Sequence, residues 1–321
     1  MVEFATPETI KQPLGRGLIP SVLKPEDHIM GAGVFTGPEW TILQPDGQWN
    51  AFEPQAELQR DAYGDTYACV SFSCNNVHEF LHNKLYGVAL NKSDRFLAIG
   101  SGTVRGQGNS KSTVAEWNRT NGFVLEQFCP YDSNTTLDQF YSPINQDLKA
   151  QGFLALNTYL FGYKWLQDNS PANLKLGLTY SPVQVDVEGQ YAFNAKGYVI
   201  NGGGAYCHEV MIFGYEDGVC WYLFDSESLQ WLKFDWGFKF GSPMIHSLTR
   251  KPMPILYKQN SSPAIYALDE EKKTLVAFAD GAINGSELFK TLYGVSNFSQ
   301  LKIIHVDVLP YQIAPYQFKT I

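Results

Sequence analysis

The spacing of apolar residues changes partway along this chain, and that change constrains the fold more than any other feature. Apolar residues recur at helical spacing in three segments, 66–83, 109–121 and 145–170. Four later segments alternate instead, between glycine or acidic turns: 183–187, 209–213, 220–224 and 231–234. A helical half that precedes a strand-rich half is typical of an α+β fold with a cleft between two lobes.

Proline, glycine and turn signals divide the chain into three parts. Residues 1–50 carry many prolines and glycines and little periodicity, which predicts an extended N-terminal arm. Residues 51–250 hold both periodic halves and form the predicted main domain. Pro252 and Pro254 mark a boundary. Strand-like segments at 264–268, 274–278 and 303–308, with a short helix at 286–292, then predict a small β-rich domain over 251–321.

The composition excludes several classes of function. The 321 residues include 24 Lys and Arg against 32 Asp and Glu, and the resulting net charge of −8 disfavours nucleic acid and anionic membranes as partners. No apolar run approaches the ~18 residues that a membrane span needs, and no signal peptide is recognisable at the N-terminus. The five cysteines are odd in number and lack a disulfide-like spacing, which favours a reducing compartment such as the cytoplasm.

A cysteine, a histidine and an aspartate follow one another in settings that suit nucleophilic catalysis. Asp65 and Thr66 are candidate N-cap residues, so Cys69 is expected in the first turn of a helix, where the thiolate is favoured. His208 starts one predicted strand and Asp225 ends the next. Because a thiol nucleophile needs a base, and that base an orienting group, these residues predict the active site of a cysteine peptidase.

The segments around these residues resemble the papain family of cysteine peptidases over roughly residues 52–240. Cys69-Val70-Ser71-Phe72-Ser73 is similar to the family's nucleophile motif, except that the aromatic residue after the cysteine is absent. Further similar segments follow in the family's order: Ser93–Leu97, Gly106–Asn109, Gly122–Glu126, Pro130-Tyr131, Ser181–Val183, His208–Tyr215 and Asp225-Ser226. The chain is most similar to compact members from bacteriophages and bacteria, which commonly carry Asp at the third position.

The resemblance implies a role for each residue of the site. Cys69 would attack a carbonyl carbon as thiolate, His208 would act as base and then as acid, and Asp225 would orient the imidazole. The backbone N–H of Cys69 would donate to the oxyanion. Gly108 and Asn109 would lie along the substrate backbone.

The sequence departs from the family pattern at two positions. Tyr63 stands where the family places the oxyanion glutamine, six residues before the cysteine, and Gln59 is the nearest candidate if the intervening loop is longer. Glu227 stands where the family has a tryptophan, with Trp231 as a stand-in. The disulfide that braces the family's cleft also has no obvious counterpart.

Two alternatives stay open. One is a papain-like fold that has lost activity and serves as a binding or structural protein. The other is a zinc metallopeptidase, because His78-Glu79-Phe80-Leu81-His82 matches H-E-x-x-H. Against zinc, Leu85 stands where the extended motif needs glycine. On a helical wheel His78 and His82 also point away from Cys69, so a partly exposed helix face is expected there.

The sequence therefore predicts an α+β, papain-like fold that hydrolyses peptide or isopeptide bonds through a thioester acyl-enzyme. No metal or organic cofactor is expected. The expected partner is a peptide or protein substrate, with neither nucleic acid nor membrane, and the C-terminal domain is a candidate attachment to a larger assembly. The predicted location is the cytoplasm, or the virion or host cytoplasm if a phage encodes the chain. The N-terminal arm is a candidate cover for the cleft.

Overall fold

The computed structural model describes residues 3–12, 17–21, 40–252, 255–261, 265–269, 274–279 and 303–310. The helix predicted at 286–292 lies outside the described residues, as does much of the N-terminal arm. Within the described ranges, no helix is long and apolar enough to cross a membrane.

An eight-stranded sheet forms one lobe of the main domain. Its strands, in spatial order, are β3 (Tyr159–Trp165), β10 (Gly241–Arg250), β4 (Val183–Glu188), β7 (Tyr206–Glu216), β8 (Cys220–Asp225), β9 (Gln230–Asp235), β6 (Val199–Ile200) and β5 (Ala192–Phe193). Neighbours are antiparallel except for β6 and β9, which are parallel. The four strands predicted from alternating residues are confirmed as β4, β7, β8 and β9.

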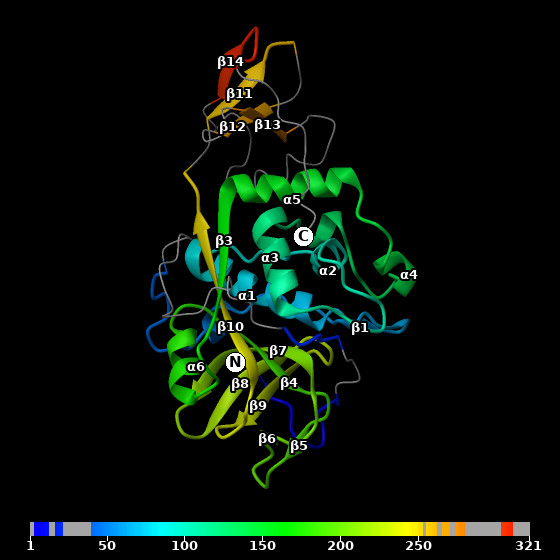
Figure 1. The fold of residues 1–321 in the computed structure, drawn as a ribbon, viewed down its shortest axis with the longest axis vertical. Coiled ribbons are helices and arrows are strands. Elements are labelled where there is room, and N and C mark those ends of the chain that lie inside the picture. Colours follow the sequence, from blue (N-terminus) through cyan, green and yellow to red (C-terminus); the bar gives the residue numbers. More distant parts are fainter. Residues whose placement is uncertain are drawn as a thin grey trace.

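All of the helices but the last gather at one end of this sheet, and the last lies beside the strands away from the others, as Figure 1 shows. They are α1 (Cys69–Tyr86), α2 (Asp94–Gly100), α3 (Lys111–Asn121), α4 (Leu137–Phe140), α5 (Gln146–Thr158) and α6 (Pro171–Leu178), with 3₁₀ turns at Asn50–Phe52 and Glu126–Phe128. Helices together with a largely antiparallel sheet make this an α+β fold, as predicted. The helices predicted at 66–83 and 109–121 correspond to α1 and α3.

Helix α1 lies at the centre of the molecule. It packs against α2 and α3 on one side and against β7 and β10 on the other, and every residue from Cys69 to His82 is buried. Its polar side chains therefore need partners inside the protein. The Ser73 hydroxyl donates to Val210 O at 3.1 Å, and Gln184 Nε2 donates to Val70 O at 3.2 Å. These bonds fix the start of α1 against the sheet.

The start of α1 differs from the prediction. The N-cap is Ala68, which has no side-chain acceptor, so the candidate caps Asp65 and Thr66 are wrong. Asp65 instead accepts from the Tyr67 backbone N–H at 2.8 Å, in a turn before the helix that places Tyr67 at φ +52°. The prediction that Cys69 lies in the first helical turn is correct, since it is the first helical residue.

The single helix predicted at 145–170 is wrong in its second half. Helix α5 ends at Thr158, and Tyr159–Trp165 is strand β3, paired antiparallel with β10. The segment Tyr-Leu-Phe-Gly-Tyr-Lys-Trp is rich in aromatic residues, which fit a pleated surface better than a helix. The segment pairs with β10, a strand that was not predicted, and this pairing favours the strand over the helix.

A second, four-stranded sheet follows the main domain. Its order is β13 (Thr274–Ala279), β12 (Ile265–Asp269), β11 (Leu256–Gln259), β14 (Ile303–Val306), with β11 and β14 parallel. Figure 1 shows this sheet beyond α5. The β-rich character expected for this region is confirmed, and the domain limits 1–50, 51–250 and 251–321 stay predictions.

A buried ion cluster ties the helical lobe to the sheet. Lys111, the first residue of α3, lies 2.5 Å from an Asp186 carboxylate oxygen on β4 and 3.5 Å from Glu209 Oε1 on β7. Its ammonium also donates to the Ser242 carbonyl. The Lys111 and Glu209 side chains are wholly excluded from solvent. Burial raises the pKa of Glu209 well above its usual value even beside the ammonium, so the cluster stabilises the protein only while Lys111 supplies its positive charge to these buried carboxyl groups.

Replacing Lys111 with Met should lower the free energy of unfolding by about 3–5 kcal/mol, because it leaves two buried carboxylates without their cation. Lys175→Met is the matched control, since the Lys175 pair with Asp217 at 2.9 Å is exposed and such pairs contribute little. Urea denaturation followed by tryptophan fluorescence measures both. If both variants lose the same free energy of unfolding, the buried cluster stabilises the protein no more than an exposed ion pair does.

Candidate active site

The fold brings Cys69, His208 and Asp225 together from three different elements. Cys69 begins α1, His208 lies near the start of β7, and Asp225 ends the neighbouring strand β8. His208 Nε2 lies 2.9 Å from Asp225 Oδ1, and all three residues are fully buried. Cys69 and His208 lie close enough for each to shift the pKa of the other, although the second ring nitrogen, His208 Nδ1, has no hydrogen-bond partner among the described residues. The order cysteine, histidine, aspartate is thus a spatial arrangement as well as a sequence pattern.

Asp225 is held in its charged form by several hydrogen bonds. Tyr191 donates its hydroxyl to Oδ2 at 2.9 Å, and the Glu227 backbone N–H donates to Oδ1 at 2.9 Å. Burial works against the carboxylate, yet His208, Tyr191 and the Glu227 N–H together lower the Asp225 pKa below its usual value. Tyr191 was not predicted, and it carried no recognisable sequence signal.

The charges in the site favour an imidazolium. Burial opposes the charged ring, but Asp225 and the thiol of Cys69 outweigh it and raise the pKa of His208 well above its usual value. For Cys69, burial dominates and raises the thiol pKa, although the interaction with His208 lowers it. The covered form of the site therefore holds a base with high proton affinity beside a thiol that burial keeps protonated.

Gln59, the predicted oxyanion residue, lies next to Ser226, the residue after Asp225, and its side-chain amide is already hydrogen-bonded. Gln59 is buried, and its backbone N–H donates to Ser226 O at 2.9 Å. Its side-chain Nε2 donates to Asp65 Oδ1 at 3.0 Å. Tyr63, at the position where the resemblance expects glutamine, is half exposed. The role of Gln59 stays a prediction.

A segment of the N-terminal arm lies directly over the thiol. Gly17 O accepts from the Asn109 N–H at 2.9 Å, Ile19 N donates to Asn109 O at 2.8 Å, and Leu18 N donates to Cys207 O at 3.2 Å. Leu18 and Asn109 pair in parallel. The segment is therefore held by backbone hydrogen bonds on both sides of the site.

Only glycine permits this close approach. A Cβ added to Gly17 would lie 2.5 Å from the Tyr67 carbonyl oxygen and 3.0 Å from Cys69 Sγ. A Cβ on Gly108, whose φ is +88°, would lie 1.8 Å from Gly17 O. Gly108 and the Asn109 backbone, predicted to lie along a substrate, thus contact the chain's own arm. The sequence offered no sign that Gly17 would be the contacting residue.

A second carboxylate, which the sequence reading assigned no role, lies near the triad. Glu227 is buried, with Oε2 3.8 Å from His208 Nδ1 and Oε1 3.6 Å from Arg60. It occupies the position where the resemblance expects tryptophan. Trp231, the suggested stand-in, packs on Phe213 and Phe224 at ring-centroid distances of 4.9 and 4.5 Å.

The H-E-x-x-H residues do not converge on one point. His82 Nδ1 lies 3.0 Å from the His78 carbonyl oxygen, and Glu79 Oε1 accepts from the Lys92 backbone N–H at 2.6 Å. The expectation of a partly exposed helix face is wrong, since His78 and His82 are both buried. Within the described part of the chain, His78 lies instead near Cys74 and His246, with one possible ligand atom of each within 4.8 Å of the other two.

No protein-family model and no curated protein sequence matches this chain. Solved structures of similar fold include the bromelain protease of Ananas comosus in complex with the E64 inhibitor, at 15% identity and TM-score 0.45, over 62% of this chain and 97% of that one. The cysteine protease and lectin-like domains of Cwp84 from Clostridium difficile match at 17% identity and TM-score 0.48, over 68% and 55%. Procathepsin L 3 from the larval midgut of Tenebrio molitor matches at 13% and 0.44, over 69% and 75%. These similarities concern the fold alone.

Replacing Asp225 with Asn should lower the pKa of His208, because it removes the carboxylate that stabilises the imidazolium while keeping the side chain's shape. The folded-state pKa of His208 is raised, so its charged form stabilises the protein below the unfolded value of ~6.5, and this contribution is lost as pH rises through the folded pKa. The variant should lose that pH dependence. NMR titration of the His208 ring measures the shift.

Asp235→Asn is the matched control. Asp235 ends the next strand, β9, and accepts from Asn194 Nδ2 at 2.9 Å rather than from a histidine. The pKa of His208 should not change in this variant. An unchanged His208 pKa in Asp225→Asn would show that Asp225 does not control the imidazole.

Proposed function

We propose that this chain is a cysteine peptidase that hydrolyses peptide or isopeptide bonds through a thioester acyl-enzyme. The observation that carries the proposal is the buried pair of His208 Nε2 and Asp225 Oδ1, 2.9 Å apart, with Cys69 at the start of α1 close enough to influence the pKa of the imidazole. A thiol, a base with raised proton affinity and an orienting carboxylate are the parts that thiol acyl transfer needs.

In this proposal the uncovered Cys69 thiol loses its proton to form a thiolate beside the His208 imidazolium, and the Cys69 sulfur attacks the carbonyl carbon of the scissile bond. The Cys69 backbone N–H at the start of α1 stabilises the oxyanion, since Ala68 supplies no capping side chain to compete for the first-turn donors. His208 then protonates the leaving amine, which departs and leaves a thioester. Water, deprotonated by His208, attacks the thioester and releases the acid, and the thiol is restored.

A substrate would take the place of residues 17–21. The Asn109 N–H, the Asn109 carbonyl and the Cys207 carbonyl now bond to the arm, and all are backbone groups that an extended peptide can use whatever its side chains. Movement of the arm would also return Cys69 to solvent. Because burial is the main cause of its raised pKa, exposure would lower that pKa while the contribution of His208 remains.

Activity is tested in a Gly17→Ala background, because a Cβ at Gly17 would clash with the Tyr67 backbone and displace the arm from the site. Purified protein should cleave members of a peptide library, and a thioester intermediate on Cys69 should be detectable by mass spectrometry after acid quench. Adding Cys69→Ala should reduce cleavage by roughly 10³-fold or more. Cys220→Ala, which removes a buried thiol from β8, should leave cleavage unchanged. Rapid alkylation of Cys69 without any cleavage would favour the inactive binding protein instead.

The Gly17→Ala substitution should increase the rate at which iodoacetamide alkylates Cys69. The added Cβ meets the Tyr67 backbone at 2.5 Å, which cannot yield as a flexible side chain would. Overpacking typically costs about 1–3 kcal/mol, and 1.4 kcal/mol is a factor of ten, so a roughly tenfold or greater increase is expected. The pH dependence of alkylation should also move to lower pH, and mass spectrometry locates the label.

Gly204→Ala is the matched control for this experiment. Gly204 is exposed, and its added Cβ would come no nearer than 3.7 Å to the side chain of Glu188. Alkylation of Cys69 should proceed at the wild-type rate in this variant. If Gly17→Ala also reacts at the wild-type rate, the arm does not limit access to the thiol.

A further inference from the structure

A buried cluster of one thiol and two imidazoles lies away from the proposed active site. Cys74 and His78 are one helical turn apart on α1, so both project from the same face. His246 comes from strand β10, which packs against that helix. One ligand atom from each, Sγ and two ring nitrogens, lies within 4.8 Å of the other two, and all three residues are buried. The proposed peptidase reaction uses none of them.

The hydrogen bonding of the two histidines is incomplete. His78 Nδ1 lies 2.6 Å from Asn118 Nδ2, and His246 Nε2 lies 2.6 Å from Gln184 Oε1. Among the described residues, the second nitrogen of each ring, His78 Nε2 and His246 Nδ1, has no hydrogen-bond partner. Unsatisfied buried polar atoms cost free energy, and a ligand that accepts their lone pairs would recover it.

Each histidine of the cluster has a side-chain amide next to one ring nitrogen, and metal-binding histidines commonly have a hydrogen-bond partner at that place. A histidine that ligates a metal usually donates its other N–H to an oxygen, and this bond fixes the ring and its tautomer. Gln184 Oε1 is such an acceptor for His246. Asn118 Oδ1 has no partner among the described residues, and turning the amide over would present that oxygen to His78 Nδ1–H. Each imidazole would then have a free lone pair.

Burial keeps the three side chains of the cluster uncharged when no ion is bound. Burial and the nearby Lys92 keep the pKa of His78 well below its usual value, and burial lowers that of His246 to about 3, so both rings are neutral ligands. Burial raises the pKa of Cys74 to about 12, so the free thiol keeps its proton. A bound cation would displace that proton, as metals do on binding thiols.

We propose that Cys74, His78 and His246 form a structural Zn²⁺ site that pins helix α1 to strand β10. One sulfur and two imidazole nitrogens are a ligand set that zinc favours, with water or another group in the fourth position. Ligand atoms around a tetrahedral zinc lie roughly 3.3–3.8 Å apart, so side-chain shifts of about 1 Å would complete the site.

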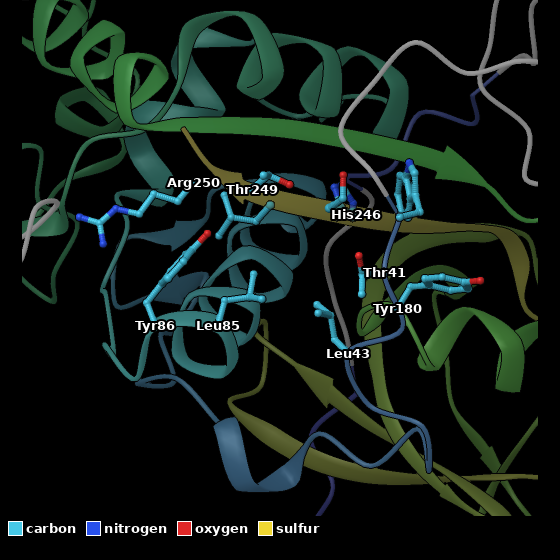
Figure 2. A pocket seen from close by; sticks show the side chains of 11 residues that line it. Thr41, Leu43, Leu85, Tyr86, Tyr180, His246, Thr249 and Arg250 are labelled. Carbon is cyan, nitrogen blue, oxygen red and sulfur yellow. The ribbon is translucent and has the colours of Figure 1, made fainter. Parts of the chain in front are cut away.

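An open cavity of about 350 Å³ provides a route toward this cluster. His246 is one of its lining residues, together with Tyr86, Tyr180 and Arg250. Figure 2 shows these side chains around the cavity, with His246 on the β10 ribbon. The cavity therefore ends beside the buried His246, one of the three residues of the cluster.

The site is tested in the full chain carrying Cys69→Ala, so that the proposed catalytic thiol cannot bind the ion. Protein freed of metal by a chelator is titrated with Co²⁺, and we expect one equivalent with a thiolate-to-cobalt charge-transfer absorption. Zn²⁺ should displace the cobalt. Cys74→Ser should abolish the charge-transfer band, and Gln184→Leu, which removes the oxygen behind His246 together with the Nε2 bond to Val70 O, should weaken binding about 10–100-fold. Cys220→Ser is the matched thiol control and should bind as the parent does.

A second measurement uses no variant of the three ligand residues, so misfolding of a variant cannot affect its result. X-ray absorption of the zinc-loaded Cys69→Ala protein should show one sulfur at about 2.3 Å and two imidazole nitrogens at about 2.0–2.1 Å. Only nitrogen and oxygen ligands, no stoichiometric binding, or a charge-transfer band that survives Cys74→Ser would overturn the proposal. None of these outcomes bears on the peptidase activity, which depends on Cys69 and His208.

Discussion

The burial of helix α1 is the constraint on which the rest of this structure depends. A helix buried along most of its length must find partners inside the protein for every polar side chain it carries. Here the partners come from both lobes: Ser73 bonds to β7, and Asn75 Nδ2 donates to Asp94 Oδ1 of α2 at 2.8 Å. These two bonds tie the helix to both lobes, although the Ser71 hydroxyl and His78 Nε2 have no hydrogen-bond partner among the described residues. Cys69, at its first residue, is thereby placed against the strands that carry His208 and Asp225.

The active-site charges follow from the same low-dielectric surroundings. In a buried site an unpaired charge is costly, so the imidazole and the carboxylate each stabilise the charged form of the other. The pKa of His208 is raised and that of Asp225 lowered, although burial opposes both shifts. The bonds to Asp225 from Tyr191 and from the Glu227 N–H keep its carboxylate ionised. Burial can therefore strengthen this pair, whereas it suppresses ionisation of the thiol beside it.

The sequence predicted the local elements well and the long-range contacts poorly. Alternating residues identified β4, β7, β8 and β9, and the helix-start setting of Cys69 was correct even though the expected caps were wrong. A helix was wrongly predicted over the β3 segment, because its strand conformation depends on pairing with β10, about 80 residues later in the chain. In the site, the order of Cys69, His208 and Asp225 was visible in the sequence. Tyr191 was not, because its distance from Asp225 is set by the packing of the sheet and not by any local pattern.

The contact between Gly17 and the site depends on the absence of a side chain, whereas the triad depends on hydrogen bonds and charge. A side chain at this position would have to overlap the Tyr67 carbonyl, so a chain that places backbone directly over its own thiol requires glycine there. Residues 17–21 of the cover carry no charged side chain and bond mainly through backbone groups, with one further bond from the Ser112 N–H to the Ser21 hydroxyl, so the effect of the cover on the site is chiefly exclusion of water. Exclusion of water raises the pKa of Cys69 and leaves the His208–Asp225 pair intact. The covered protein therefore keeps its base and orienter assembled while the nucleophile is held protonated, and removal of the cover alone would change the state of the thiol.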